Sequence, residues 1–189
     1  LRLQARRLQV PEARAALEEA VRRVGSIAIV HETLSLTPDE MIDFDEIADR
    51  VITMAGEVSA PETQVVPKRI GSFGVLPAQI ATPLAMVLTE LLQNALEHGL
   101  PDRQGELEVL AARREGAQPR LEVVVSDNGV GMPADFDPER TTSLGLQIVR
   151  TLVVGELGGR LEFKARPGGG TEVFVGIPLT SVKRPTGTG

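Results

Sequence analysis

The chain has 189 residues, which suffices for one domain, or for one domain with a small appendage. Its formal net charge is −6 and only 3% of its residues are aromatic, so nucleic acid is not expected as its main partner. The absence of Cys excludes disulfides, thiolate zinc sites and cysteine nucleophiles, and two His are too few for a His-rich metal centre. With no apolar run of membrane-spanning length and no signal peptide, the sequence predicts a cytoplasmic protein.

Residues 1–36 are predicted to form a helical hairpin that is interrupted at Pro11. In its second helix, the residues that recur at alternating spacings of four and three are Leu17, Val21, Val24, Ala28 and His31. This pattern is typical of a coiled-coil seam, so we expect residues 1–35 to form a homodimer interface. Because the chain begins with Leu1 and not with Met, we expect it to be a piece of a longer protein.

After Pro38 the sequence predicts alternating helices and strands. Helices are expected at 44–58, 77–98 and 144–154, and strands or short extended pieces at 65–70, 73–76, 106–112, 121–126, 160–165 and 171–178. The run Val123-Val-Val125 fits a strand that is buried on both faces. This order of elements predicts a two-layer α/β sandwich over residues 43–180, followed by a loose tail at 181–189.

The helix expected at 77–98 carries three polar side chains at intervals of four residues, namely Glu90, Asn94 and His98. This spacing places them on one stripe of the helix. The amide oxygen of Asn94 suits Mg²⁺, which keeps several waters and bridges phosphates, and Glu90 could accept a proton or orient a nucleophile. An ordinary amphipathic helix with a polar face is the alternative, and the stripe alone does not decide between the two.

A second motif, Asp127-Asn-Gly-Val-Gly131, follows a predicted buried strand. A carboxylate fixed at the end of such a strand can accept a hydrogen bond from the exocyclic amine of adenine, and it would repel the carbonyl of guanine. Gly129 and Gly131 allow a positive φ and a close approach of the backbone. Taken alone, the motif also fits a simple Asn-Gly turn.

Two further segments favour an anion site. Ser143-Leu-Gly-Leu146 opens a predicted helix, where a Ser cap and free N–H groups beside Gly145 favour bound phosphate. Gly168-Gly-Gly-Thr171 allows close backbone approach, although it also fits a plain hairpin turn. The intervening residues 132–142 resemble a mobile lid, and Arg140 is their only cation.

The two commonest nucleotide-binding motifs are absent, since the chain contains neither G-x-x-x-x-G-K-S/T nor G-x-G-x-x-G. The motifs that are present combine a magnesium ligand, a carboxylate that reads a base and glycine-rich segments that approach phosphates. Together they predict an ATP site without a Walker loop, in a protein of a phosphotransfer system.

In order and spacing, the four motifs resemble the N, G1, G2 and G3 boxes of the gyrase, Hsp90, histidine-kinase and MutL (GHKL) ATPase superfamily, over residues 43–179. The resemblance implies the Bergerat fold, with ATP and Mg²⁺ as ligands. It further implies that Asn94 holds Mg²⁺, that Asp127 reads adenine with Thr171 helping through a water, and that Glu90 assists phosphoryl transfer. The other residues that it implies around the nucleotide are His98, Gly129, Gly131, Arg140, Ser143, Leu144, Gly145, Leu146 and Gly170. Many histidine kinases carry a Lys where this chain has Glu97, so phosphate contacts are expected from elsewhere, such as Arg140.

Residues 1–7 and 23–32 resemble the dimerisation segment of the second histidine-kinase subfamily. The resemblance implies a kinase that moves the γ-phosphate of ATP to its own His and then to an Asp of a response-regulator receiver domain. In that family the phosphoacceptor His lies on the first helix, upstream of the segment that matches Leu1, and His31 does not match it. The chain alone is therefore not expected to phosphorylate itself.

Two alternatives to a sensor histidine kinase remain at this stage. An anti-sigma-factor serine kinase has the same fold and the same polar helix stripe, but it would lack the seam between Leu17 and His31. A non-enzymatic nucleotide-binding interaction module would be favoured by loss of Asn94 or Asp127, and both are present.

Overall fold

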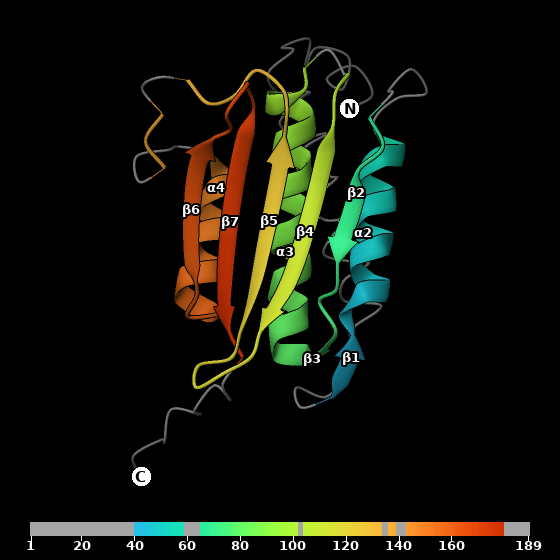
Figure 1. Ribbon diagram of the computed structural model, residues 1–189, viewed down its shortest axis with the longest axis vertical. Coiled ribbons are helices and arrows are strands. Elements are labelled where there is room, and N and C mark those ends of the chain that lie inside the picture. Colours follow the sequence, from blue (N-terminus) through green and yellow to red (C-terminus); the bar gives the residue numbers. More distant parts are fainter. Residues whose placement is uncertain (1–39, 59–64, 102–103, 134–135, 139–142, 180–189) are drawn as a thin grey trace, which may run out of the picture.

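The computed structural model describes residues 40–58, 65–101, 104–133, 136–138 and 143–179. These residues form two layers, a sheet and a set of helices that covers one of its faces (Figure 1). The predicted two-layer α/β sandwich is thus confirmed. The predicted hairpin at 1–36, its homodimer seam and the tail at 181–189 lie outside the described residues.

The helical layer contains α2 (Phe44–Val58), α3 (Ala78–Asn94) and α4 (Leu144–Arg150). Helix α3 continues as a wider π-helical turn, η1 (Ala95–Gly99), and α4 continues in the same way as η2 (Thr151–Glu156). All three helices lie close to their predicted positions. None of the helices in the described ranges has the length and apolar character needed to cross a membrane.

The main sheet has five strands in the order β2-β4-β5-β7-β6. Its strands are β2 (Lys68–Gly71), β4 (Leu107–Arg114), β5 (Arg120–Asp127), β6 (Arg160–Ala165) and β7 (Thr171–Pro178). Strand β2 pairs with β4 in parallel, and the other pairs are antiparallel. A separate ribbon joins β1 (Met41–Asp43) to β3 (Val75–Pro77). Strand β1 was not predicted, because three residues are too short to show a periodic pattern.

The prediction of a strand buried on both faces at 123–125 was wrong. Val123 and Val125 are buried against the helices, but Val124 on the opposite face is only half-buried. Its cross-strand partners Leu110 and Phe174 also lie on that face, and no helix covers it in the described part of the chain. A two-layer sandwich buries one face of its sheet, so β5 follows the alternating pattern of such strands.

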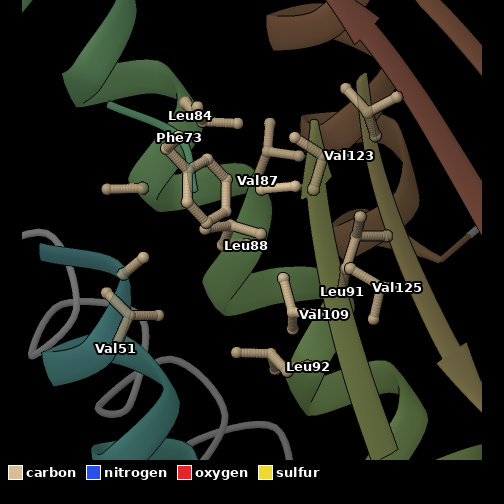
Figure 2. Close-up of a cluster of buried hydrophobic side chains, with 14 of the residues drawn as sticks. Val51, Phe73, Leu84, Val87, Leu88, Leu91, Leu92, Val109, Val123 and Val125 are labelled. Carbon is tan, nitrogen blue, oxygen red and sulfur yellow. The ribbon is translucent and has the colours of Figure 1, made fainter. Parts of the chain in front are cut away.

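The core lies between α3 and the sheet and is mostly aliphatic. Leu84, Leu88 and Leu92 are fully buried on α3, and Figure 2 shows them with Val109 and Val123 of the central strands. Leu91 is also buried, next to the polar stripe of the same helix. Packing of this face therefore fixes the rotation of α3 and the direction in which Asn94 points.

A polar cluster attaches α2 to the β2–β3 connection. The Oδ1 atom of Asp45 accepts hydrogen bonds from the Phe73 N–H (2.9 Å) and from Arg69 Nη1 (3.0 Å). Its Oδ2 atom accepts from Ser72 Oγ (2.5 Å) and the Gly74 N–H (3.3 Å). Burial raises the pKa of the Asp45 carboxyl, but the hydrogen bonds from Ser72, Phe73 and Gly74, with the charge of Arg69, outweigh it and hold the pKa below its usual range.

We expect Asp45→Ala to lower the free energy of unfolding by about 2 kcal/mol near pH 7, since four donors lose a charged acceptor. A folded-state pKa below the unfolded value stabilises the fold above the unfolded pKa, and this contribution is lost as the pH falls through the folded pKa. The difference between the two proteins should therefore shrink below about pH 4. Urea unfolding at several pH values measures it.

Glu46→Ala is the matched control, because Glu46 is exposed in the same first turn of α2. It should change the free energy of unfolding by less than about 0.5 kcal/mol. An equal loss in both variants would show that the Asp45 cluster contributes nothing beyond helix-terminal charge.

Candidate functional site

A cavity of about 490 Å³ lies at the end of the sheet where β5 ends and β7 begins, beside the C-terminal end of α3. This end of the sheet is at the top of Figure 1. Its described lining residues are Leu91, Asn94, Ala95, Glu97, His98, Gly99, Val125, Asp127, Val130, Gly131, Met132, Pro133, Phe136, Ser143, Leu146, Phe163, Thr171 and Val173. The cavity therefore collects residues from all four predicted motifs. This volume suits a small ligand.

Asp127 is the last residue of β5 and is only 3% exposed. Its Oδ1 atom accepts hydrogen bonds from the backbone N–H of Gly129 (2.9 Å) and of Thr171 (3.3 Å). Both hydrogen bonds end on the same oxygen, so the carboxylate is held in one orientation and Oδ2 is left for a ligand in the cavity. Asn128 has a different role. Its Oδ1 accepts a hydrogen bond from the Glu106 N–H (2.7 Å), which joins the loop after β5 to the residue before β4.

Three glycines allow the backbone to pack around Asp127. A Cβ on Gly99 would lie 2.9 Å from Asp127 Oδ2, and one on Gly129 would lie 1.8 Å from the carbonyl oxygen of Gly99. Gly170 has φ +96°, and a Cβ there would lie 2.0 Å from the carbonyl oxygen of Asp127. Separations of this kind are sterically forbidden for any residue with a side chain. The end of η1, the end of β5 and the β6–β7 turn can thus meet only because these positions are glycine.

The loop after Asp127 is tied to the end of η1. The Val130 N–H donates a hydrogen bond to the Gly99 carbonyl oxygen (2.8 Å), and Gly131 follows with φ +76°. Gly131 lines the cavity, whereas Gly129 packs against Gly99 and is not among the lining residues.

The polar stripe of α3 divides into two parts. Asn94 and His98 line the cavity, while Glu90 is buried one turn earlier with 8% exposure and is not among its lining residues. The Nδ2 atom of Asn94 is buried and has no hydrogen-bond partner among the described residues. Oxygen and nitrogen of an amide are assigned from their partners, so an unsatisfied amide atom here is available to a ligand.

These residues fit Mg²⁺ held together with phosphates. Within the described ranges, no group of three or more His, Asp or Glu side chains converges to hold a metal ion. Mg²⁺ in phosphate sites commonly takes one or two protein oxygens, with the rest from phosphate and water. The amide of Asn94 could supply one such oxygen, and Asn94 is the Mg²⁺ ligand that the sequence predicts.

The segment at 143–146 matches the prediction only in part. Ser143 occupies the N-cap position of α4, but its side chain makes no capping hydrogen bond, so the predicted Ser cap was wrong; its carbonyl accepts from the Gln147 N–H (3.1 Å). Ser143 and Leu146 line the cavity. Leu144 is 58% exposed and Gly145 is buried in the helix packing, and neither lines it. Thr171 lines the cavity and Gly170 packs against the backbone of Asp127, whereas Arg140 lies outside the described residues.

The sequence interpretation missed the apolar walls of the cavity. Leu91, Ala95, Val125 and Val173 form part of them, and each is buried. Phe136 and Phe163 also line the cavity and meet edge to face, with ring centroids 5.7 Å apart. A Phe within the polar, Pro-containing segment 132–142 was the available signal, but nothing local identified its partner.

Comparisons with known proteins agree with this geometry. Residues 79–181 match a family model described as histidine kinase-, DNA gyrase B- and HSP90-like ATPase, and residues 1–58 match one described as histidine kinase. The sensor histidine kinase PdtaS of Mycolicibacterium smegmatis is 46% identical over 179 residues, covering 95% of this chain and 36% of that protein. Blue-light-activated histidine kinase 2 of Erythrobacter litoralis is 30% identical over 168 residues, covering 86% and 47%. The chain thus spans about a third to a half of the length of these curated relatives.

Solved structures show the same fold. The histidine kinase domain of the Erythrobacter litoralis EL346 blue-light activated histidine kinase has a TM-score of 0.73 and 28% identity, over 85% of this chain and 74% of that chain. The catalytic domain of histidine kinase ThkA has a TM-score of 0.59 over 74% of this chain and 96% of that chain, and at 21% identity it shows the fold alone. Because the match to residues 79–181 covers more than half of the chain, the chain belongs to the histidine kinase-, DNA gyrase B- and HSP90-like ATPase family, as an ATP-binding domain of the histidine-kinase type.

Proposed function

We propose that the chain is the ATP-binding catalytic part of a two-component sensor histidine kinase. The longer protein would move the γ-phosphate of ATP to one of its own His side chains and then to an Asp of a response-regulator receiver domain. The observation that carries the proposal is the buried carboxylate of Asp127, which two backbone N–H groups hold by one oxygen at the wall of the cavity.

Asp127 would select adenine through its second oxygen. An adenine inserted between Leu91, Val125 and Val173 has apolar contacts for its ring, and its exocyclic amine can donate to Asp127 Oδ2. Guanine presents a carbonyl oxygen at the same position, so two acceptors would face each other in a buried site. Such an unpaired contact is costly, and this cost is the physical basis of the selectivity.

The phosphates would extend along α3, away from the adenine. The close contact between Gly99 and Asp127 marks the adenine end. Asn94 ends α3 one π-helical turn before Gly99, and Glu90 lies four residues before Asn94, which corresponds to roughly 6 Å further along the axis of α3. In this orientation Asn94 would lie beside the phosphate chain and Glu90 toward its far end.

Each polar residue then has a distinct task. Asn94 would hold Mg²⁺, which when bound neutralises phosphate charge, since catalysis of phosphoryl transfer depends on positioning and charge neutralisation. The carboxylate of Glu90 would orient the phosphoryl acceptor. His98 and Thr171, which both line the cavity, would contact the nucleotide.

Contacts within the sandwich support a set of domain boundaries. Helix α2 packs against α3, and β2 forms one edge of the sheet beside β4, so we propose that the ATPase unit extends over residues 43–180. Residues 1–36 would then form part of the dimerisation hairpin. The match of residues 1–58 to a histidine kinase model supports this assignment, and a homodimer through residues 1–35 follows from the proposal.

Asp127→Asn should weaken ATP binding by about 10²–10⁴-fold while the protein stays folded. The Asn side chain keeps the shape and retains one acceptor for Gly129 and Thr171, but it presents an NH₂ donor to the adenine amine. Isothermal calorimetry with ATP and with GTP measures the effect. In the longer protein, the same variant should lose acid-labile label from γ-labelled ATP.

Glu115→Gln is the control for charge, because Glu115 is exposed in the turn between β4 and β5, at the other end of the sheet. It should bind ATP as the parent does. Unchanged ATP affinity in Asp127→Asn would refute the assignment of the cavity.

Gly170→Ala should abolish ATP binding, because its Cβ would lie 2.0 Å from the Asp127 carbonyl oxygen and would force the strand end to move. Gly168 provides a matched control, since it also has positive φ (+91°) but has nothing within 4 Å of an added Cβ. Gly168→Ala should lose about 1–2 kcal/mol of stability and keep its ATP affinity. Thermal melting and ATP titration of both variants separate the two effects, and equal loss of binding would mean that strain in the turn, not the clash, controls the site.

Asn94→Ala should weaken binding of ATP in the presence of Mg²⁺ by about tenfold or more, and it should leave adenosine binding unchanged. The reason is that Asn94 lies beside the phosphates and not beside the adenine. Fluorescence titration with adenosine and with ATP, each with and without Mg²⁺, is the measurement. A similar loss for adenosine would place Asn94 in the base pocket instead.

A further inference from the structure

The antiparallel pairing of β4 with β5 ends in a pair that is formed partly by a side chain. The register of the two strands, in which Leu107 faces Asp127, places Asn128 opposite Glu106. The Asn128 N–H donates to the Glu106 carbonyl oxygen (3.2 Å), as in a regular ladder. In return, the Glu106 N–H donates to Asn128 Oδ1 (2.7 Å), where a regular pair would use the backbone carbonyl oxygen. The amide of Asn128 therefore completes the last pair of the ladder.

This use of a side chain allows the main chain to leave the sheet directly after Asp127. Strand β5 ends at Asp127, and the N–H of Gly129 donates back to Asp127 Oδ1 (2.9 Å). A hydrogen bond from the N–H of residue i+2 to an Asp side chain is a feature of turns and not of extended strands. The Asn128 side chain thus supports the turned conformation in which the Gly129 N–H orients Asp127.

The same loop has further attachments that use the backbone alone. The Val130 N–H donates to the Gly99 carbonyl oxygen (2.8 Å), and the Asn128 N–H donates to Glu106. Loss of the Asn128 side chain would leave both of these hydrogen bonds. Glu106 is exposed, so water can replace Asn128 Oδ1 as the acceptor for its N–H. The loop would therefore keep its place, while the orientation of Asp127 would become less restricted.

We propose that Asn128 is a positioning residue for base selection: its side-chain amide holds the loop after β5 so that the Gly129 N–H keeps the Asp127 carboxylate directed at the base. Asn128 is exposed and is not among the described residues that line the cavity, so it acts through Asp127 and not by contact with the ligand. The inference rests on the proposed function, since it takes the exocyclic amine of adenine as the group that Asp127 binds.

The test compares two nucleotides that differ only in this amine, ATP and purine riboside triphosphate. The parent chain should bind ATP about 10–100-fold more tightly, because only ATP can donate a hydrogen bond to the Asp127 carboxylate. In Asn128→Ala, the affinity for ATP should fall about fivefold, and the affinity for purine riboside triphosphate should change by less than about twofold. Competition against a fluorescent ATP analogue measures both dissociation constants.

A loss of stability would give a different result. A variant that merely destabilised the fold would lower both affinities by the same factor, because only the folded fraction binds ligand. Asn128→Ala should melt within about 4 °C of the parent chain, since water replaces the lost acceptor.

Two further variants isolate the hydrogen bond. Asn128→Asp keeps an acceptor oxygen at the same place and should restore the preference for ATP to within about twofold of the parent value. Gln104→Ala removes an amide side chain at an exposed position two residues before Glu106, and it should change neither dissociation constant.

The outcomes separate this inference from the proposed function. If the parent chain binds neither nucleotide, or binds both equally well, the proposed role of Asp127 fails. If the parent chain prefers ATP and Asn128→Ala keeps that preference, weakens both nucleotides equally or does not fold, the inference is overturned while the proposed function stands. Failure of Asn128→Asp to restore the preference would also overturn it, because the proposed role requires only an acceptor oxygen at this position.

Discussion

Three separate backbone segments meet around one buried carboxylate, and the proposed ATP site depends on this close approach. The end of η1, the end of β5 and the β6–β7 turn approach Asp127 so closely that a single Cβ at Gly99 or Gly170 would collide with it. This close packing brings backbone N–H groups to the Asp127 carboxylate and orients it. Unlike side-chain donors, backbone N–H groups cannot move away by changing rotamer. The register of the sheet and the rotation of the helix therefore determine the geometry of the ligand site. The helix that carries Asn94 continues as η1 to Gly99, the glycine that touches Asp127.

The remainder of the sandwich keeps these segments in register. Burial of Leu84, Leu88 and Leu92 against the central strands sets the rotation of α3. With this rotation, Asn94 faces the cavity. At the other side, Asp45 joins α2 to the β2–β3 connection through four hydrogen bonds. Apolar packing therefore holds α3 in register with the sheet, which matters because Asn94 and Asp127 line the same cavity from different elements.

Local patterns in the sequence were sufficient for most of the fold. Strands β6 and β7 were predicted with the bounds that the structure has, because each follows alternating side chains and ends at a turn. Strand β1 was missed because it owes its existence to pairing with β3, a contact that no local pattern encodes. Their motifs predicted Asp127 and Asn94 as site residues, and both line the cavity. Gly99 reads locally only as a helix stop, and the contact of Phe136 with Phe163 depends on tertiary folding.

The parallel pairing of β2 with β4 has a consequence for how the chain can be divided. Two neighbouring parallel strands need a long crossover connection, and the one between β2 and β4 includes α3. Strand β2, which forms one edge of the sheet, therefore comes before the segment that matches the ATPase family model. A piece cut at residue 79 would carry the nucleotide motifs but would uncover the backbone of β4, with Leu110 already 40% exposed on its outer side. Such an uncovered edge is prone to intermolecular strand pairing, so the segment that carries the nucleotide motifs and the smallest stable folding unit are not the same stretch of chain.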